Sequence, residues 1–180
     1  MAARSEPTIF AIPGTSTLRL AEAGAGAAVS RSQPEELFAK ATPRHVFIIL
    51  VDDNPADVLL VREALAWHEV KSDLLVARDG DEAIRVLDEI DSLVLPCPDL
   101  VVLDLNLPRK NGFEVLERMR SSGLCRTAPV AILSSSDAPA DRQKAERLGA
   151  SQYFQKPSNL TDFMSIGAKL KDMLHLKESK

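Results

Sequence analysis

The sequence predicts an α/β protein built on a doubly wound sheet of five parallel strands. Short apolar runs alternate with longer segments whose apolar residues recur every three or four positions, over about 130 residues. The short runs are apolar at nearly every position, which is typical of parallel strands covered on both faces; a strand with one wet face alternates instead. We therefore expect helices on both sides of one sheet.

The first two strand–helix units begin after His45. A strand over 45–51 precedes Asn54-Pro55, a helix-start signal because proline is tolerated in the first turn. A second strand over 74–77 precedes the turn Asp79-Gly80-Asp81 and another helix. The apolar sides of these two helices are formed by Val58, Val61 and Leu65, and by Ala83, Ile84, Leu87 and Ile90.

Three further units complete the alternation. The predicted strands are 100–103, 130–133 and 152–155. The first is followed by a loop over 104–111, and the helix after the second, at about 138–148, stops at Gly149. The apolar sides of the third and fifth helices are formed by Phe113, Val115, Leu116 and Met119, and by Phe163, Ile166, Leu170 and Leu174.

Residues 1–44 differ in composition from the rest of the chain. They are rich in Ala, Gly, Ser, Thr and Pro and have no sustained period, apart from a short helix predicted at 35–40. Such a segment buries too little apolar surface to offset the entropy of ordering it. We expect a flexible N-terminal extension over 1–44, or else an arm that folds on a partner, and a folded domain over 45–176.

Charge, hydropathy and cysteine content exclude several classes of protein. The net charge of −4 argues against a nucleic-acid-binding domain, which is usually basic. No apolar run reaches the roughly 18 residues needed to span a bilayer, and residues 1–31 have no apolar core typical of a signal peptide. Cys97 and Cys125 have no metal-type spacing, so we expect two reduced thiols in a cytoplasmic protein.

Four of the predicted strands end in polar residues of different kinds. Asp52-Asp53 follow the first strand, Asp104 the third, Ser134 the fourth and Lys156 the fifth. Parallel strands place their carboxyl ends at one edge of the sheet, which is where open α/β sheets bind ligands. We therefore expect three carboxylates, one hydroxyl and one ammonium in a single pocket, a set suited to a divalent metal and a phosphoryl group.

Each of these residues also has an interpretation without chemistry. Asp52-Asp53 could lie in a surface turn, Asp104 and Lys156 could form a structural ion pair, and a serine after a strand is commonly a cap. In the functional interpretation, Asp104 is a carboxylate nucleophile that accepts phosphate and Lys156 neutralises the incoming oxygens. A cis peptide at Pro157 would help to aim the lysine.

The order and spacing of these motifs resemble the receiver domain of bacterial two-component response regulators. The motifs are Asp52-Asp53, the run from Asp104 to Gly112, Leu-Ser-Ser-Ser at 133–136 and the run from Leu148 to Pro157. The resemblance covers about 45–175 and implies a flavodoxin-like (βα)₅ receiver fold. Within the family, 104–112 and the turn at 54–57 are most similar to single-domain regulators that serve phytochrome-type histidine kinases.

The resemblance implies roles for individual residues. Asp104 matches the phosphoacceptor, Lys156 the lysine that pairs with the acyl phosphate, and Ser134 the switch hydroxyl. Tyr153 matches the aromatic residue that turns inward on activation, although a half-buried strand tyrosine is the plain alternative. The implied Mg²⁺ ligands are Asp53, Asp104 and the backbone carbonyl of Asn106, with Asp52 acting through water.

The implied function is phosphorelay signalling rather than conventional enzymatic catalysis. A histidine kinase would phosphorylate Asp104, and the switched face would contact a downstream protein or a second copy of the chain. That face comprises the helix at 138–148, the strand at 152–155 and the last helix; few residues follow it, so we expect output by contact. The principal alternative is a metal-dependent phosphohydrolase with an aspartyl-phosphate intermediate. A pseudo-receiver and a DNA-binding regulator are further, weaker alternatives.

Overall fold

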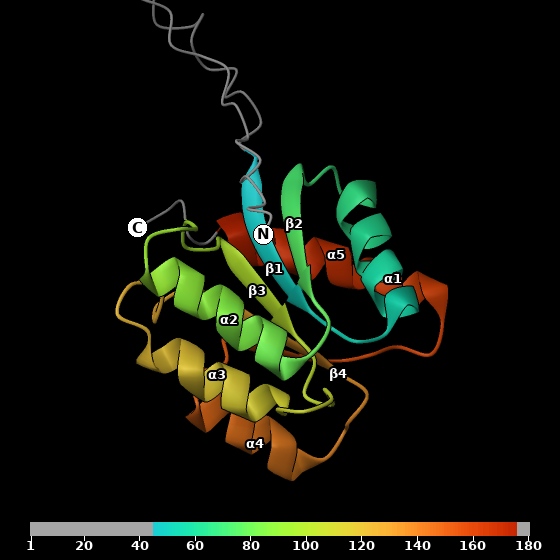
Figure 1. Ribbon diagram of the computed structural model, residues 1–180. Helices are drawn as coiled ribbons and strands as arrows, with labels where there is room; N and C mark the ends of the chain where they lie inside the picture. The colour runs from blue at the N-terminus through green and yellow to red at the C-terminus, as the bar shows by residue number, and fades with distance from the viewer. Residues whose placement is uncertain (1–44, 176–180) are drawn as a thin grey trace, which may run out of the picture. The chain divides into compact units, whose positions relative to one another are not determined.

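The computed structural model describes residues 45–175 and confirms the predicted fold class (Figure 1). Five parallel strands form one sheet in the order β2-β1-β3-β4-β5. The elements in chain order are β1 (Val46–Val51), α1 (Pro55–Trp67), β2 (Ser72–Ala77), α2 (Gly80–Asp91), β3 (Leu100–Leu103), α3 (Gly112–Ser121), β4 (Val130–Ser134), α4 (Pro139–Arg147), β5 (Gln152–Gln155) and α5 (Leu160–His175).

The alternating direction of strand side chains divides the interior into two cores. In β1, Ile48 and Leu50 face α1 and α5, whereas Ile49 and Val51 belong to the other core, with α2 and α3. β3 and β4 contribute to both cores in the same way. Because both faces of the sheet are covered, all four residues of β3 and all five of β4 are buried, which explains the uninterrupted apolar sequence of β3 and of the first four residues of β4.

The strand order places the direction change of the winding between β1 and β3. The chain leaves β1 toward β2 on one side, whereas β3 is followed by β4 and β5 on the other. The backbone N–H of Asp104 donates to the carbonyl of Val51 at 2.9 Å, which aligns the ends of the two strands. Ligands bind in doubly wound sheets at this switch point, and the predicted acidic residues lie there.

Side-chain caps start the helices at the predicted signals. Asn54 caps α1, because its side chain accepts a hydrogen bond from the N–H of Ala56. Asp79 caps α2 in the same way, by accepting from the N–H of Glu82. Asn111 and Glu114 form a reciprocal capping box at α3. Gly149 follows α4 with a φ of +87°, which favours glycine. The largest differences are at β2, which begins two residues earlier than predicted, and β4, which includes Ser134 as its last residue.

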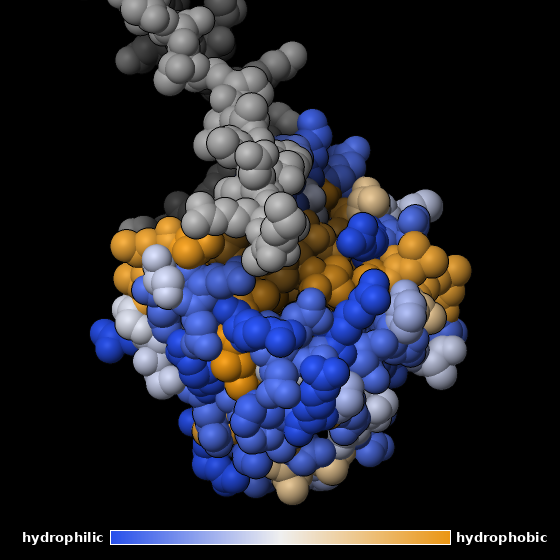
Figure 2. Space-filling model, in the orientation of Figure 1, coloured by the Kyte–Doolittle hydropathy of each residue, from blue (hydrophilic) through white to orange (hydrophobic). Residues whose placement is uncertain are grey.

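Hydrophilic side chains dominate the surface over α2, α3 and α4, whereas hydrophobic ones gather beside α1 and α5 (Figure 2). Leu59, Trp67 and Leu160 are more than half exposed there and line a hollow of about 590 Å³. Gly167 of α5 lies close to the backbone of Ala64 in α1: a Cβ added at Gly167 would be only 2.7 Å from the carbonyl carbon of Ala64. The two helices are therefore closely packed. No helix within 45–175 is long and apolar enough to cross a membrane.

The prediction of two reduced thiols is wrong: Cys97 and Cys125 form a disulfide with a Cα–Cα distance of 5.5 Å. Cys97 lies just before β3, and Cys125 lies between α3 and β4. Because β3 and β4 are paired neighbours, the loops that lead into them lie side by side, which the spacing of the cysteines did not reveal. A cis bond at Pro157 is also wrong, since every peptide bond described is trans. The helix predicted at 35–40 lies outside the described residues.

Candidate functional site

Three predicted carboxylates meet at the switch point of the sheet. Asp52 and Asp53 directly follow β1, and Asp104 directly follows β3. Asp52 and Asp104 are buried, whereas Asp53 is exposed, and one oxygen of each lies within 4.8 Å of the others. Magnesium is held by carboxylate oxygens and retained waters. The donor set therefore fits a hard divalent cation that has access to solvent on the Asp53 side.

Local backbone geometry aims the two buried carboxylates. Asp52 accepts a hydrogen bond at Oδ1 from the N–H of Asn54 at 2.9 Å, and Asp104 accepts one at Oδ1 from the N–H of Asn106 at 3.0 Å. Each acid thus bonds to the backbone two residues further on, an arrangement typical of aspartate in turns. The Oδ2 atom of each acid is directed toward the end of β5, where it accepts a hydrogen bond from Lys156.

Lys156 lies among the acids, and it binds two carboxylates in addition to its predicted partner, Asp104. Its Nζ donates to Oδ2 of Asp104 at 2.7 Å and to Oδ2 of Asp52 at 2.9 Å. The third partner is Oδ2 of Asp57, in the first turn of α1, at 2.8 Å. Sequence reasoning missed Asp57 because an acid at this position is explained by the positive end of the helix dipole.

Burial and pairing change the proton affinities of two members of this cluster. Burial raises the pKa of Asp52, and its hydrogen bonds to Lys156 and to the N–H of Asn54 only partly oppose the rise. For Lys156, burial acts to lower the pKa, but hydrogen bonds to Asp104, Asp57 and Asp52 outweigh it, so the net shift is upward. Lys156 is therefore a firmly held cation at neutral pH.

Ser134 and Asn106 lie next to the acidic cluster on the β4 side. The hydroxyl of Ser134 is completely buried and accepts from the N–H of Ser136 at 3.3 Å. The Asn106 amide lies 3.1 Å from the hydroxyl of Ser135 and 3.5 Å from that of Ser134. The side chains of Ser134, at the end of β4, and Asn106, in the loop that begins at Asp104, therefore lie close together.

Tyr153 is half-buried in β5 and contacts the start of α4. Its hydroxyl donates to the carbonyl of Ser136 at 2.9 Å, and the guanidinium of Arg142 lies 4.7 Å from the ring centre. Ser136 in turn donates to Asp141 at 2.6 Å. Hydrogen bonds therefore connect the loop after Ser134, the first turn of α4 and the Tyr153 ring.

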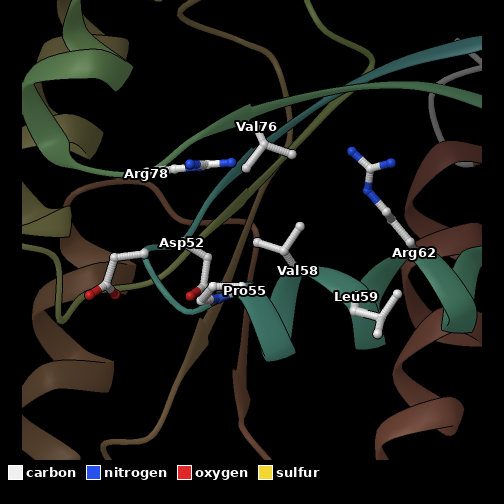
Figure 3. A pocket seen from close by; sticks show the side chains of 8 residues that line it. Asp52, Pro55, Val58, Leu59, Arg62, Val76 and Arg78 are labelled. Carbon is white, nitrogen blue, oxygen red and sulfur yellow. The ribbon is translucent and has the colours of Figure 1, made fainter.

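A hollow of about 320 Å³ lies beside the acids, between α1 and β2. Figure 3 shows Asp52 at one end of it and Arg62 at the other, with the guanidinium of Arg78 directed toward Val76. Its apolar lining comprises Pro55, Val58, Leu59 and Val76. The hollow therefore borders the acidic cluster on the side of Asp52 and Asp53, whereas Asp104 does not line it.

Fold and site together define a protein class. Residues 48–166, more than half of the chain, match the family model described as response regulator receiver domain. The chain belongs to this family, and it is a receiver domain of phosphorelay signalling.

Individual relatives show which response regulators the chain is similar to. Response regulator Rcp1 of Synechocystis sp. is 34% identical over 120 residues, which cover 66% of this chain and 82% of Rcp1. The transcriptional regulatory protein TrcR of Mycobacterium tuberculosis is 37% identical over 118 residues, but the chain spans only 42% of its length. The match to such longer transcriptional regulators is therefore confined to part of those proteins.

Solved structures agree with this placement. The crystal structure of the phosphorylated cyanobacterial phytochrome response regulator RcpA is similar with a TM-score of 0.66 and 36% identity, covering 73% of this chain and 94% of RcpA. The Mn²⁺-bound form of Rcp1 has a TM-score of 0.64 and 32% identity, covering 70% of this chain and 91% of Rcp1. The predicted receiver fold is confirmed.

Proposed function

We propose that Asp104 is the phosphoacceptor of this receiver domain and that a histidine kinase, of the phytochrome type, is the donor. The observation that carries the proposal is the buried carboxylate of Asp104, which lies 2.7 Å from the ammonium of Lys156 and beside two further acids. The similarity to RcpA and Rcp1, which the chain matches over most of their length, supports the choice of kinase.

In the proposed reaction, an Asp104 oxygen forms a bond to phosphorus as the N–P bond of the partner's phosphohistidine breaks. The imidazole nitrogen keeps the electron pair of that bond. Phosphoryl transfer depends mainly on positioning and on neutralising charge. Lys156 is already in place to donate to phosphoryl oxygens, and the buried Ser134 hydroxyl is one loop away.

A divalent cation belongs to the proposal because the donor set fits one. Asp53 and Asp104 would hold Mg²⁺ directly, together with the backbone carbonyl of Asn106, and Asp52 would act through water. Bound there, Mg²⁺ would neutralise negative charge on the transferred group. Lys156 is a cation supplied by the chain itself, because its hydrogen bonds to Asp104, Asp57 and Asp52 raise its pKa.

The proposed output is a change of packing on the face made by α4, β5 and α5. A phosphoryl group adds nearly two negative charges at Asp104, which would draw the Ser134 hydroxyl toward it and free Tyr153 to change position. To populate the new packing almost fully, phosphorylation must favour it by about 5 kcal/mol. The bond from Tyr153 to Ser136 supports this route, since it joins the ring to the loop that would move.

The partner for this face would be a downstream protein or a second copy of the chain. Phe163, Ile166 and Leu170 do not contribute to it, because all three are buried in the core beneath β1 and β3. Tyr153 and Phe154 remain partly exposed on β5. Sedimentation with and without a phosphoryl mimic would decide between the two, since only self-association changes the mass of the particle.

Incubation of the full chain with phosphoramidate and Mg²⁺, followed by intact-mass measurement, tests the proposal. We expect one phosphate on the wild-type chain and on Asp88→Asn, a control that removes an acid from α2 far from the site. Asp104→Asn is expected to remain unmodified. A phosphate that persists on Asp104→Asn would contradict the assignment, and release of many equivalents of phosphate from a small ester would favour the phosphohydrolase.

A further inference from the structure

Asp57 is a third carboxylate on Lys156, and the proposed reaction does not yet use it. Its Oδ2 accepts from the lysine Nζ at 2.8 Å, as close as the bonds from Asp52 and Asp104. An ammonium group has three N–H donors and no acceptor. All three donors of Lys156 are therefore engaged, and the ammonium is held from three directions.

The structure also fixes Asp57 itself. Asp57 lies in the first turn of α1, where the helix dipole favours an anion. The side-chain amide of Asn54 donates to the same oxygen, Oδ2, at 3.0 Å. The side chain of Asp57 is only 18% exposed and the side chain of Lys156 only 11% exposed, so water competes weakly for the contact. Asp57 is thus a rigid acceptor rather than a mobile surface acid.

Of the three acids that bind Lys156, only Asp57 has no role in the proposed phosphoryl transfer or metal binding. Asp104 would lose its carboxylate charge on forming the acyl phosphate, and Asp52 belongs with Asp53 and Asp104 to the cluster that fits a cation. During transfer, Lys156 must give up at least one of its three bonds in order to reach a phosphoryl oxygen. The bond to Asp57 is the one that can persist throughout.

We propose that Asp57 is a positioning residue that anchors the Lys156 ammonium over Asp104 through both phosphorylation and hydrolysis. The inference rests on the proposed function. Transition states for gaining and losing the phosphoryl group both concentrate charge on oxygens that Lys156 would contact. A lysine without its anchor would spend less time in the productive position, so both rates should fall together.

A matched pair of variants tests this anchor. Asn159 and Asp162 begin α5 as Asn54 and Asp57 begin α1, with an amide-to-carboxylate bond of 2.8 Å, but Asp162 does not contact Lys156. Asp57→Asn and Asp162→Asn therefore remove the same charge from equivalent helix positions. Only the first variant weakens a bond to the lysine, because the neutral amide oxygen of asparagine accepts less strongly than a carboxylate oxygen.

The first measurement compares two rates in the full chain. One is phosphorylation by phosphoramidate, in which the bond from Asp104 to phosphorus forms as the N–P bond breaks and ammonia leaves after taking up a proton. The other is hydrolysis of the acyl phosphate. We expect Asp57→Asn to lower both by about tenfold, since small misplacements of a reacting group have effects of this size or larger. Asp162→Asn is expected to leave both unchanged.

Other patterns overturn the inference. If Asp57 acted only through its charge, the loss of that negative charge in Asp57→Asn would favour binding of the anionic donor. Phosphorylation would then become faster while hydrolysis stayed the same. Equal rates in the two variants would exclude anchoring altogether. A wild-type chain that takes no phosphate on Asp104 would instead refute the proposed function, which keeps the two failures distinct. If Asp57→Asn does not fold, Asp57→Ser provides the same comparison.

A second readout needs neither metal nor phosphate. The ζ-ammonium of a lysine with three hydrogen bonds exchanges its protons slowly enough to be seen by nitrogen-detected or proton-detected NMR of the metal-free protein. We expect the Lys156 signal in the wild type and in Asp162→Asn, and its loss by fast exchange in Asp57→Asn. A Lys156 signal of equal intensity in all three proteins would contradict the anchor.

Discussion

Gly112 is the first residue of α3, and its missing side chain determines how closely that helix approaches the acceptor loop. A Cβ added at Gly112 would overlap the carbonyl oxygen of Asp104 and lie 2.7 Å from the Cα of Leu105. Ordinary contacts between carbon atoms are about 3.5–4.0 Å. The substitution Gly112→Ala therefore requires the backbone beside Asp104 to move by about 1 Å, because no flexible side chain is available to give way.

The expected cost follows from that displacement. Overpacking by one methyl group costs about 1–3 kcal/mol in a rigid setting, and contact with backbone places Gly112→Ala at about 2–3 kcal/mol. With a urea m-value of about 1.5 kcal/mol/M, the unfolding midpoint should fall by about 1.3–2 M. Phosphorylation of Asp104 should also slow by about tenfold or more, since its backbone is displaced.

Gly123→Ala is the control, because a Cβ at Gly123 has no neighbour within 4 Å. We expect the free energy of unfolding of Gly123→Ala to lie within about 0.5 kcal/mol of that of the wild type. Urea unfolding followed by circular dichroism measures both variants under one set of conditions. Equal midpoints for Gly112→Ala and Gly123→Ala would refute the reasoning, since it would mean that the helix and the Asp104 loop can separate without cost.

Two further predictions concern parts of the molecule away from the phosphorylation site. Hydrogen bonds from Ser122 and Arg118 lower the pKa of Asp91, so its contribution to stability is present above the ordinary aspartate pKa of about 3.9 and is lost as the pH falls through the lowered value. The acid slope of unfolding free energy should be shallower in Asp91→Asn; an identical slope would contradict this. Reduction of the Cys97–Cys125 disulfide, whose separation is 28 residues, should cost about 3.5 kcal/mol. The unfolding midpoint of a variant with both cysteines changed to serine should not respond to reductant. A wild-type midpoint that reductant leaves unchanged would contradict a stabilising role of the disulfide.

The local patterns of the sequence were sufficient for the fold and for most of the site. Apolar runs placed all five strands with errors of at most about two residues at their ends, and helix-start signals and apolar periodicity predicted a helix after each of them. The polarity of parallel strands then required Asp52, Asp53, Asp104 and Lys156 to share one edge. The structure brings them together there, with Lys156 on two of the three acids.

Contacts between distant parts of the chain were not accessible in this way. Asp57 and Lys156 are 99 residues apart, and only the angle at which α1 leaves β1 aims that carboxylate at the end of β5. The approach of Cys97 to Cys125 likewise follows from the pairing of β3 with β4. Neither pair has a local pattern, because each depends on the direction of a side chain in the packed state.

The sequence by itself therefore determined the class of architecture and the edge of the sheet where chemistry takes place, since burial on two faces and strand polarity are written in short-range patterns. Only the tertiary structure decided which acids hold the lysine, how tightly α3 closes on the Asp104 loop and which loops are covalently joined. Those features depend on distances of a few ångströms between segments that meet only when both cores are packed.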